Sequence, residues 1–186
     1  EYSFAYQKQP TVAKKVTRDG VKKSLRSHIG TVPVVLFEPG DLQLLAGSPS
    51  ARRGYIDTIL CQTDPEYLQA LNEYKRALRQ RNALLRDHGF VPADVLFAWN
   101  VQLTGPAIIL RNKRQEFIAY LQSRLPSLYA SIAGKTHELD IQYQPNPELD
   151  ITDESQLLAR LESVFGRDAA AGFTTVGPHR DDFAVM

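Results

Sequence analysis

The sequence predicts an α+β protein in which a small sheet is followed by a helical lobe built around an antiparallel, coiled-coil-like hairpin. Three patterns indicate this class. Apolar and polar residues alternate near the start of the chain, as they do in strands. Two central segments, at about 64–87 and from about 93 onward, repeat apolar residues at steps of three and four, as paired helices do. From Phe183 the chain returns to a strand-like pattern.

These patterns also predict the order of the elements. We expect strands of a small sheet up to about residue 37, and a further strand near the end of the chain, from Phe183. Within the lobe we expect the hairpin at about 64–122, a strand at about 137–144 and a helix at about 153–165.

The first segment contains several strand signals and a hairpin turn. Residues 2–6 alternate, and the strands expected at 12–17 and 21–25 flank Asp19-Gly20, a pair typical of tight hairpin turns. Residues 32–37 are continuously apolar, which predicts a strand buried on both faces. The lysines of this segment either protect sheet edges against aggregation or face a nucleic acid.

A helix is predicted to begin at Ser48. A serine oxygen can accept a hydrogen bond from an amide of the first turn, and Pro49 fits the first helical position. Arg52 and Arg53 then lie where cations oppose the positive end of the helix dipole. Two interpretations are open. Either Arg53 pairs with Asp57 one turn later, or the two arginines and the free amides form a phosphate site.

The helical hairpin is predicted to start at Asp64-Pro65, an N-cap followed by a first-turn proline, and to turn near Gly89. The return helix is expected from about Ala93 to Gly134, with a kink at Gly105-Pro106. The expected seam residues are Tyr67, Leu71, Tyr74, Leu78, Arg81 and Leu85 on the first helix, and Trp99, Leu103, Pro106, Leu110, Lys113, Phe117 and Tyr120 on the second.

Basic residues cluster on both helices of the hairpin. Periodicity places Lys75, Arg79 and Arg86 away from the seam, which is typical of a solvated face and also suits DNA phosphates. Arg81 occupies a seam position, so it either pairs across the hairpin or serves a partner surface. The candidates for contacting DNA or a partner are Lys75, Arg76, Arg79, Arg81, Asn82, Arg111, Lys113 and Arg114.

The last third of the chain alternates again. A helix capped by Thr152 or Asp153 is expected to bury Phe165 on its apolar face and to stop at Gly166. Residues 175–182 then hold His179-Arg180 and two acids, a set with the chemistry for a metal or a phosphate. Sequence neighbours in an extended chain point to opposite sides, so we favour a structural turn over one shared metal site.

Composition excludes several classes of protein. The chain has 186 residues, 43% of them hydrophobic, which is enough for a packed core. It has no apolar run of the roughly 18 residues that a membrane span needs. A single cysteine, Cys61, permits no internal disulfide and fits a reducing cytosol. No catalytic serine, zinc or glycine-rich phosphate motif can be assembled.

Charge is segregated along the chain, although its net value is only +1. Residues 1–37 hold seven Lys/Arg against two acids, residues 38–136 hold twelve against nine, and residues 137–186 hold three against ten. Such segregation allows a basic face for nucleic acid, but it also arises when segments of opposite charge pair within one fold.

Three motifs, in order, carry a family resemblance. Phe-Glu-Pro-Gly-Asp-Leu at 37–42 leads into Gly-Ser-Pro-Ser-Ala-Arg-Arg-Gly-Tyr-Ile-Asp at 47–57, and it is followed by Tyr-Lys-Arg-Ala-Leu-Arg-Gln-Arg-Asn at 74–82 and Gly-Pro-His-Arg-Asp-Asp at 177–182. Together they resemble the RecF family of bacterial DNA replication and repair proteins, which are SMC-like ATPases of the ABC type. The chain departs from the family pattern at Gly40 and at Tyr55-Ile56.

The resemblance implies a cytoplasmic, nucleoid-associated protein without a membrane partner. It implies an ATPase that uses ATP and magnesium and binds DNA, at single-strand gaps or as double-stranded or junction DNA, as an ATP-dependent homodimer. With RecO and RecR it would place RecA at single-strand gaps. It also implies that this chain is an internal segment without the Walker A, signature and Walker B motifs, so it would not bind or hydrolyse ATP alone.

The same resemblance gives two alternatives for the lobe. It either contacts DNA directly or is an architectural, partner-binding element. The resemblance also implies that residues 1–46 are strands of an ATPase head, that residues 47–172 are the inserted helical lobe, and that residues 173–186 are a strand returning to the head. The stretch from Phe37 to Asp57 is then the hinge between the head sheet and the lobe. The candidates for this hinge or for a phosphate site are Ser48, Arg52, Arg53, His179, Arg180 and Asp181.

Overall fold

The N-terminal strands form a small antiparallel sheet. The computed structural model describes residues 2–7, 13–24, 28–36, 38–86, 93–135, 138–146 and 151–186. Strands β1 (Tyr2–Gln7), β2 (Ala13–Arg18) and β3 (Val21–Lys23) pair in that order. Asp19 and Gly20 both have positive φ, at 51° and 77°, which is the geometry of a type I′ hairpin turn. The predicted hairpin is therefore confirmed.

The apolar run at residues 32–36 is not the buried strand that the sequence predicts, and Phe37 lies outside the described residues. Residues 32–36 are irregular and exposed, and the side chain of Val35 is 97% accessible. The amide of Val34 donates to Oε1 of Gln62 at 2.8 Å. A run of apolar residues becomes a buried strand only where partner strands lie beside it, and β1, β2 and β3 pair only with one another.

The first helices follow the predicted order. A short 3₁₀ turn, η2 (Pro39–Leu42), and α1 (Gln43–Ala46) lead into α2 (Pro49–Thr63). The Ser48 hydroxyl accepts from the Ala51 amide at 3.3 Å, which confirms Ser48 as the N-cap.

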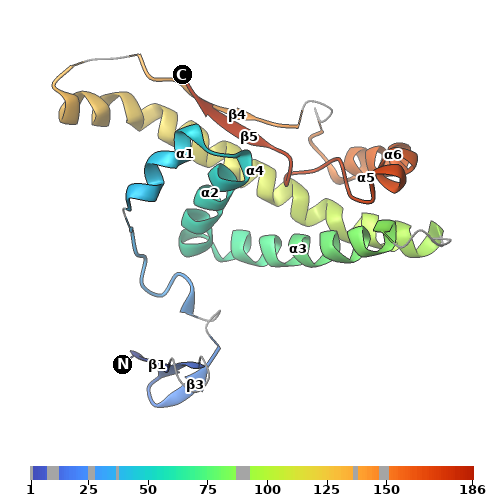
Figure 1. Cartoon of the computed structure of the whole chain (residues 1–186), viewed down its shortest axis with the longest axis horizontal. Helices are drawn as coiled ribbons and strands as arrows, with labels where there is room; N and C mark the ends of the chain where they lie inside the picture. The colour runs from blue at the N-terminus through green and yellow to red at the C-terminus, as the bar shows by residue number, and fades with distance from the viewer. Residues whose placement is uncertain are drawn as a thin grey trace.

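Two long helices form the antiparallel hairpin (Figure 1). Helix α3 (Pro65–Arg86) begins at Asp64, whose carboxylate accepts from the amides of Glu66 and Tyr67 at 2.9 and 3.1 Å. Helix α4 (Ala93–Ala133) returns alongside it and extends past the start of α3. It runs without interruption through Pro106 and Pro126, while the predicted turn at Gly89 lies outside the described residues.

The predicted seam of α3 is confirmed, and that of α4 is confirmed in part. Tyr67 and Arg81 of α3 have no exposed surface. On α4, Leu103 and Leu110 are buried as predicted, whereas Tyr120 is 57% exposed. A count of apolar positions misses the polar residues that α4 buries, which are Asn100, Thr104, Arg111 and Arg114.

The C-terminal part adds a second, two-stranded sheet. Strands β4 (Ile141–Gln144) and β5 (Asp182–Val185) pair antiparallel, with Tyr143 opposite Phe183. Between them lie α5 (Glu154–Ser163) and α6 (Phe165–Ala171). Because β5 pairs with β4, it does not join β1–β3, and the division of the chain into domains stays a prediction.

The start of α5 is as predicted and its end is not. Asp153 caps the helix by accepting from the Gln156 amide at 2.9 Å. Gly166 does not stop the helix, because the break comes at Val164 and Gly166 lies inside α6. The break also turns Phe165 outward, so this residue is 41% exposed rather than buried.

The core lies where α2, α3, α4, α5 and the β4–β5 sheet meet. Figure 1 shows β1–β3 apart from this body, at the end of an extended stretch. Among the described residues, no helix combines the length and apolar character that crossing a membrane requires.

Candidate functional site

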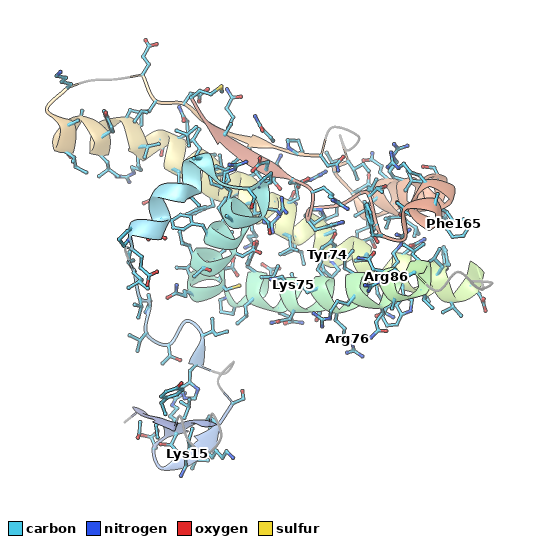
Figure 2. The ribbon with its side chains drawn as sticks, viewed as in Figure 1. Lys15, Tyr74, Lys75, Arg76, Arg86 and Phe165 are labelled. Carbon is cyan, nitrogen blue, oxygen red and sulfur yellow. The ribbon has the colours of Figure 1, made fainter. Side chains whose placement is uncertain are left out.

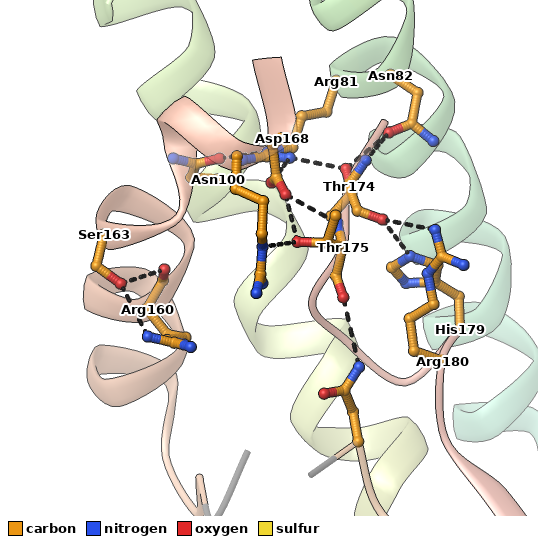
Figure 3. Close-up of polar contacts among 12 residues, drawn as sticks. Arg81, Asn82, Asn100, Arg160, Ser163, Asp168, Thr174, Thr175, His179 and Arg180 are labelled. Atoms are coloured by element: carbon orange, nitrogen blue, oxygen red, sulfur yellow. Dashed lines mark hydrogen bonds and ion pairs between the residues drawn. The ribbon is translucent and has the colours of Figure 1, made fainter. Parts of the chain in front are cut away.

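Polar side chains of α2, α3 and α4 converge on residues 172–181, which link α6 to β5 and are called here the α6–β5 segment. Figure 3 shows part of this region, including the contacts of Arg81 and Asn82 with Thr174. Arg53 of α2 donates to the Asp181 carbonyl at 2.7 Å. Tyr74 of α3 contacts His179, and Arg114 of α4 donates to the Pro178 carbonyl at 2.7 Å. The helices therefore hold a segment that has no regular structure of its own.

Arg81 is the most deeply buried cation of this region. Its Nε donates to Oδ1 of Asn100 at 2.7 Å, and its Nη1 donates to Asp168 at 2.7 Å and to the Thr174 hydroxyl at 2.8 Å. Both Arg81 and Asp168 have no exposed side-chain surface. Of the two interpretations of Arg81, the structure shows pairing across the hairpin, through Asn100 of α4.

Asn82 and Asp168 fix the backbone of the α6–β5 segment. Oδ1 of Asn82 accepts from the amide and the hydroxyl of Thr174 at 2.8 and 2.7 Å. Oδ1 of Asp168 accepts from the amide of Thr175 at 3.0 Å and from its hydroxyl. Every side chain of this buried network has at least one partner, although Nη2 of Arg81 has none among the described residues. Such a network favours one arrangement of the chain.

His179 is held in one neutral tautomer. Its Nε2 lies 3.0 Å from the Thr174 carbonyl, which can only accept, so Nε2 carries the proton. Its Nδ1 therefore accepts from the Tyr74 hydroxyl at 2.6 Å. Burial, with help from the nearby cations Arg180 and Arg53, lowers the pKa of His179 to about 4.

Asp181 is the buried anion of the segment. Its carboxylate accepts from Arg111 at 3.2 and 3.4 Å, from the Tyr143 hydroxyl, and from the Asn146 amide at 2.7 Å. Burial raises the pKa of Tyr143 above its usual value, so this hydroxyl keeps its proton. With no exposed surface, Asp181 serves the fold and does not face a ligand from outside.

Arg114 joins α4 to α2 and to the α6–β5 segment. Its Nη2 donates to Asp57 at 2.7 Å, and its Nε donates to the Tyr67 hydroxyl at 2.9 Å. The expected Arg53–Asp57 pair is therefore replaced by Arg114–Asp57, because α4 brings a buried guanidinium closer to this carboxylate.

Arg52 and Arg53 find their partners within the chain. Arg52 makes a two-point contact with Asp182, at 2.8 and 2.6 Å, and donates to the Gly47 carbonyl at 2.7 Å. The bond from Arg52 lowers the pKa of Asp182 below its usual value. The Asp182 carboxylate, at the start of β5, and the Asp181 carbonyl thus offset the two cations at the start of α2.

The predicted DNA or partner candidates separate into two groups. Arg81, Arg111 and Arg114 are buried in the network just described. Lys75, Arg76 and Arg79 are exposed on α3, and Figure 2 shows Arg76 projecting away from the rest of the fold. Lys113, the remaining cation, bridges Asp64 and Glu66 at 2.9 and 3.1 Å across the hairpin.

Sequence reasoning missed the acids and hydroxyls that complete the network. Asp168 and Thr174 carry no recognisable pattern, and Tyr143 was assigned only to a strand. The one available signal is a surplus of arginines at helix positions that face inward, because each buried guanidinium requires a carboxylate or carbonyl elsewhere.

Comparison with known proteins shows which family the chain resembles. No protein-family model matches it. It is 37% identical over 162 residues to the DNA replication and repair protein RecF of Agathobacter rectalis, covering 86% of this chain and 43% of that protein. It is 32% identical over 184 residues to the RecF protein of Leptospira interrogans, covering 98% of this chain and 49% of that protein. The chain belongs to the RecF family.

The fold agrees with this assignment. A solved structure of the recombination mediator protein RecF with ATP, from the RecFOR pathway, superposes with a TM-score of 0.82 at 26% identity. That match covers 94% of this chain and 48% of the RecF chain. The α+β, ABC-ATPase-like fold class predicted from the sequence is confirmed. This RecF-family chain spans about half the length of the relatives it matches.

Two of the residues predicted for a phosphate site have partners within the chain. Arg52 is paired with Asp182, and Asp181 is buried beneath Arg111 and Tyr143. In the described ranges, no group of three or more acidic, histidine or cysteine side chains is arranged to hold a metal ion.

Proposed function

We propose that this RecF-family chain contributes a DNA-binding surface to a protein of DNA replication and repair. The surface is the α3 basic face, defined as Lys75, Arg76, Arg79 and Arg86. All four side chains are exposed, and residues 75–86 contain no acid. This run of exposed cations on one rigid helix is the observation that carries the proposal.

The chemistry of the α3 basic face suits phosphates. Helix α3 has 22 residues and is therefore about 33 Å long, close to one turn of B-form DNA. Lys75 remains 54% exposed although its ammonium lies 3.9 Å from Asp57, which is a weak contact. Cations in this setting bind DNA mainly by releasing counterions, so the binding is expected to weaken steeply with salt.

A titration with labelled DNA tests the proposal. The triple variant Lys75→Ala, Arg76→Ala, Arg79→Ala should lower affinity for a duplex by about tenfold or more at low salt, and should flatten the salt dependence by up to about 0.9 per lost phosphate contact. Fluorescence anisotropy at several salt concentrations measures both effects. Undiminished binding by the triple variant would refute the α3 basic face.

A charge-matched control separates location from net charge. Lys15, Lys22 and Lys23 are exposed on β2 and β3, away from the body of the fold. Replacing these three by alanine removes the same charge from a different surface. The affinity of this control should stay close to that of the parent chain. An equal loss in both variants would show that net charge, and not α3, controls binding.

For the whole protein we propose the activity that the family resemblance implies. It binds ATP with magnesium, acts on DNA as an ATP-dependent homodimer in the cytoplasm, on the nucleoid, and works with RecO and RecR to place RecA at single-strand gaps during recombination and the SOS response. The names RecF-ATP and RecFOR of the matched structure support this proposal.

We propose that Arg52 and Arg53 transmit the nucleotide or dimer state of the ATPase head to the helical lobe. They bond the start of α2 to Asp181 and Asp182, at the junction of the α6–β5 segment and β5. Replacing both by alanine in the full-length protein should weaken ATP-dependent DNA binding while the chain remains folded. If only the free energy of unfolding falls, these arginines are structural.

The alternative is an architectural or partner-binding lobe without DNA contact. The burial of Arg81, Arg111 and Arg114 favours it, because these three cations serve the fold. Absence of binding to both single- and double-stranded DNA at low salt would support this alternative over the DNA-binding proposal.

A further inference from the structure

The loop that leaves α6 exposes an aromatic ring beside the α3 basic face. Phe173 is 42% exposed, and the guanidinium carbon of Arg180 lies 4.8 Å from the centre of its ring. A large exposed aromatic with a stacked guanidinium is a surface on which a flat ring can stack. We refer to Phe173 and Arg180 as the stacking platform.

The end of α6 explains why Phe173 is exposed. Gly172 has a φ of 72°, its amide donates to the Ala169 carbonyl, and the Phe173 amide donates to the Asp168 carbonyl. This is a Schellman cap, in which an apolar residue at the position of Phe173 usually packs back onto the helix. Here the residue that it would pack on is Asp168, whose carboxylate is committed to Arg81 and Thr175. The ring is therefore left outside the core.

The stacking platform is held rigidly against α3. Thr174, next to Phe173, is bonded through its amide and hydroxyl to Asn82. Arg180 donates to the Thr174 carbonyl at 3.2 Å, which fixes the guanidinium over the ring. A side chain built on Gly172 would lie 3.6 Å from Cγ of Arg86, so the platform borders the end of the α3 basic face.

The neighbouring charges favour an anionic ligand that carries a flat ring. On α3, Lys75, Arg79 and Arg86 lie within one helical stripe, because they are separated by four and seven residues. The exposed Arg180 adds a further cation, 4.8 Å from the centre of the Phe173 ring. In the described part of the chain, the acids beside these cations are already paired, Asp168 with Arg81, Asp57 with Arg114 and Asp181 with Arg111.

We propose that the stacking platform binds an unpaired nucleobase of a DNA strand whose phosphates lie on the α3 basic face. In a duplex the bases are stacked and cannot reach the ring, whereas a single-stranded extension presents them freely. The platform would then favour DNA in which a duplex on α3 continues into a single strand. This inference rests on the proposed DNA-binding function of α3.

Three labelled probes test the platform on the whole chain by anisotropy. They are a blunt duplex of about 20 base pairs, the same duplex with a tail of about ten thymidines, and the same tail with abasic nucleotides. The abasic tail keeps every phosphate and removes the bases. The chain should bind the thymidine-tailed probe about 5- to 100-fold more tightly than the abasic-tailed probe, the range expected for stacking of one base.

Variants locate the effect. Phe173→Ala should abolish the preference for the thymidine tail and leave affinity for the blunt duplex unchanged. Phe173→Tyr keeps a ring at the same place and should retain the preference, which also guards against misfolding as the cause. Lys75→Ala with Arg79→Ala should weaken binding of all three probes by a similar factor.

The outcomes separate the two claims. If no probe is bound at low salt, the proposed DNA-binding function fails, and the platform fails with it. If the blunt duplex is bound but thymidine and abasic tails are equivalent, the platform alone is refuted. Equal effects of Phe173→Ala on the thymidine and abasic tails would likewise refute stacking.

Discussion

The hydroxyl of Tyr74 lies 2.6 Å from Nδ1 of His179, a contact between residues 105 positions apart in the chain. Tyr74 belongs to the helix whose outer face carries the exposed cations, and His179 belongs to the segment that leads into β5. His179 also donates to the Thr174 carbonyl. One imidazole therefore links two points of the α6–β5 segment and joins that segment to α3. The stability of the fold should therefore depend on the protonation of His179.

Acid should destabilise the protein through His179. The pKa of His179 falls from 6.5 to about 4 on folding, so the unfolded chain binds the proton more readily. The contribution is complete above about pH 6.5 and is lost as the pH falls toward 4, by up to about 3 kcal/mol. Urea unfolding across this pH range measures the loss. His179→Asn should flatten the curve in this window, and parallel curves for parent and variant would contradict the assignment.

Gly177→Ala should destabilise the fold strongly. The φ of Gly177 is 132°, and an added Cβ would lie 2.5 Å from the Tyr74 hydroxyl. Backbone strain alone costs about 1–3 kcal/mol, and the steric clash adds to it. Urea midpoints should show a larger loss than Gly134→Ala, a control with positive φ and no atom within 4 Å. Tyr74→Phe in the Gly177→Ala background should restore part of the loss, and no restoration would place the clash elsewhere.

Arg81→Ala should cost about 3–5 kcal/mol of unfolding free energy, because it leaves the Asp168 carboxylate buried without its cation. The exposed Arg79, two residues earlier on the same helix, provides the matched control. Arg79→Ala should change stability by no more than about 0.5 kcal/mol. Denaturant unfolding of both variants distinguishes them, and a similar small effect for both would mean that the Arg81–Asp168 pair adds little to stability.

Cys61 should react slowly with thiol reagents. Burial raises the pKa of its thiol from 9.0 to about 11, so the thiolate fraction near pH 8 falls about 100-fold. Alkylation of the folded chain should therefore be about two orders of magnitude slower than alkylation of the same chain in denaturant. Comparable rates in the two conditions would show that the thiol is open to solvent.

Local patterns located most of the helices and the hairpin turn. Ser48, Asp64 and Asp153 each cap the helix that the sequence predicts, because an N-cap depends on neighbouring residues alone. The end of α5 was misplaced, since Gly166 permits a turn without requiring one. The exposed run at 32–36 was misread as a buried strand, because burial depends on neighbours that are distant in sequence.

The candidate site divides in the same way. The exposed positions of Lys75, Arg76 and Arg79 follow from helical periodicity, which the sequence contains. The partners of the buried arginines do not, because no rule relates Arg81 to Asp168 or Arg111 to Asp181 before the chain is folded. The exposure of Phe173 in the stacking platform depends in addition on the cap of α6, where the residue that Phe173 would pack on is Asp168.

By itself, the sequence determined where most of the helices begin, which face of α3 carries exposed charge, and the family to which the chain belongs. Only the tertiary structure decided that Arg52 and Arg53 meet the Asp181–Asp182 connection, and that Tyr74 meets His179. The physical reason is the sequence separation of the interacting residues. Caps and helical faces follow from residues a few positions apart, whereas a buried ion pair forms only after packing has removed water from both partners.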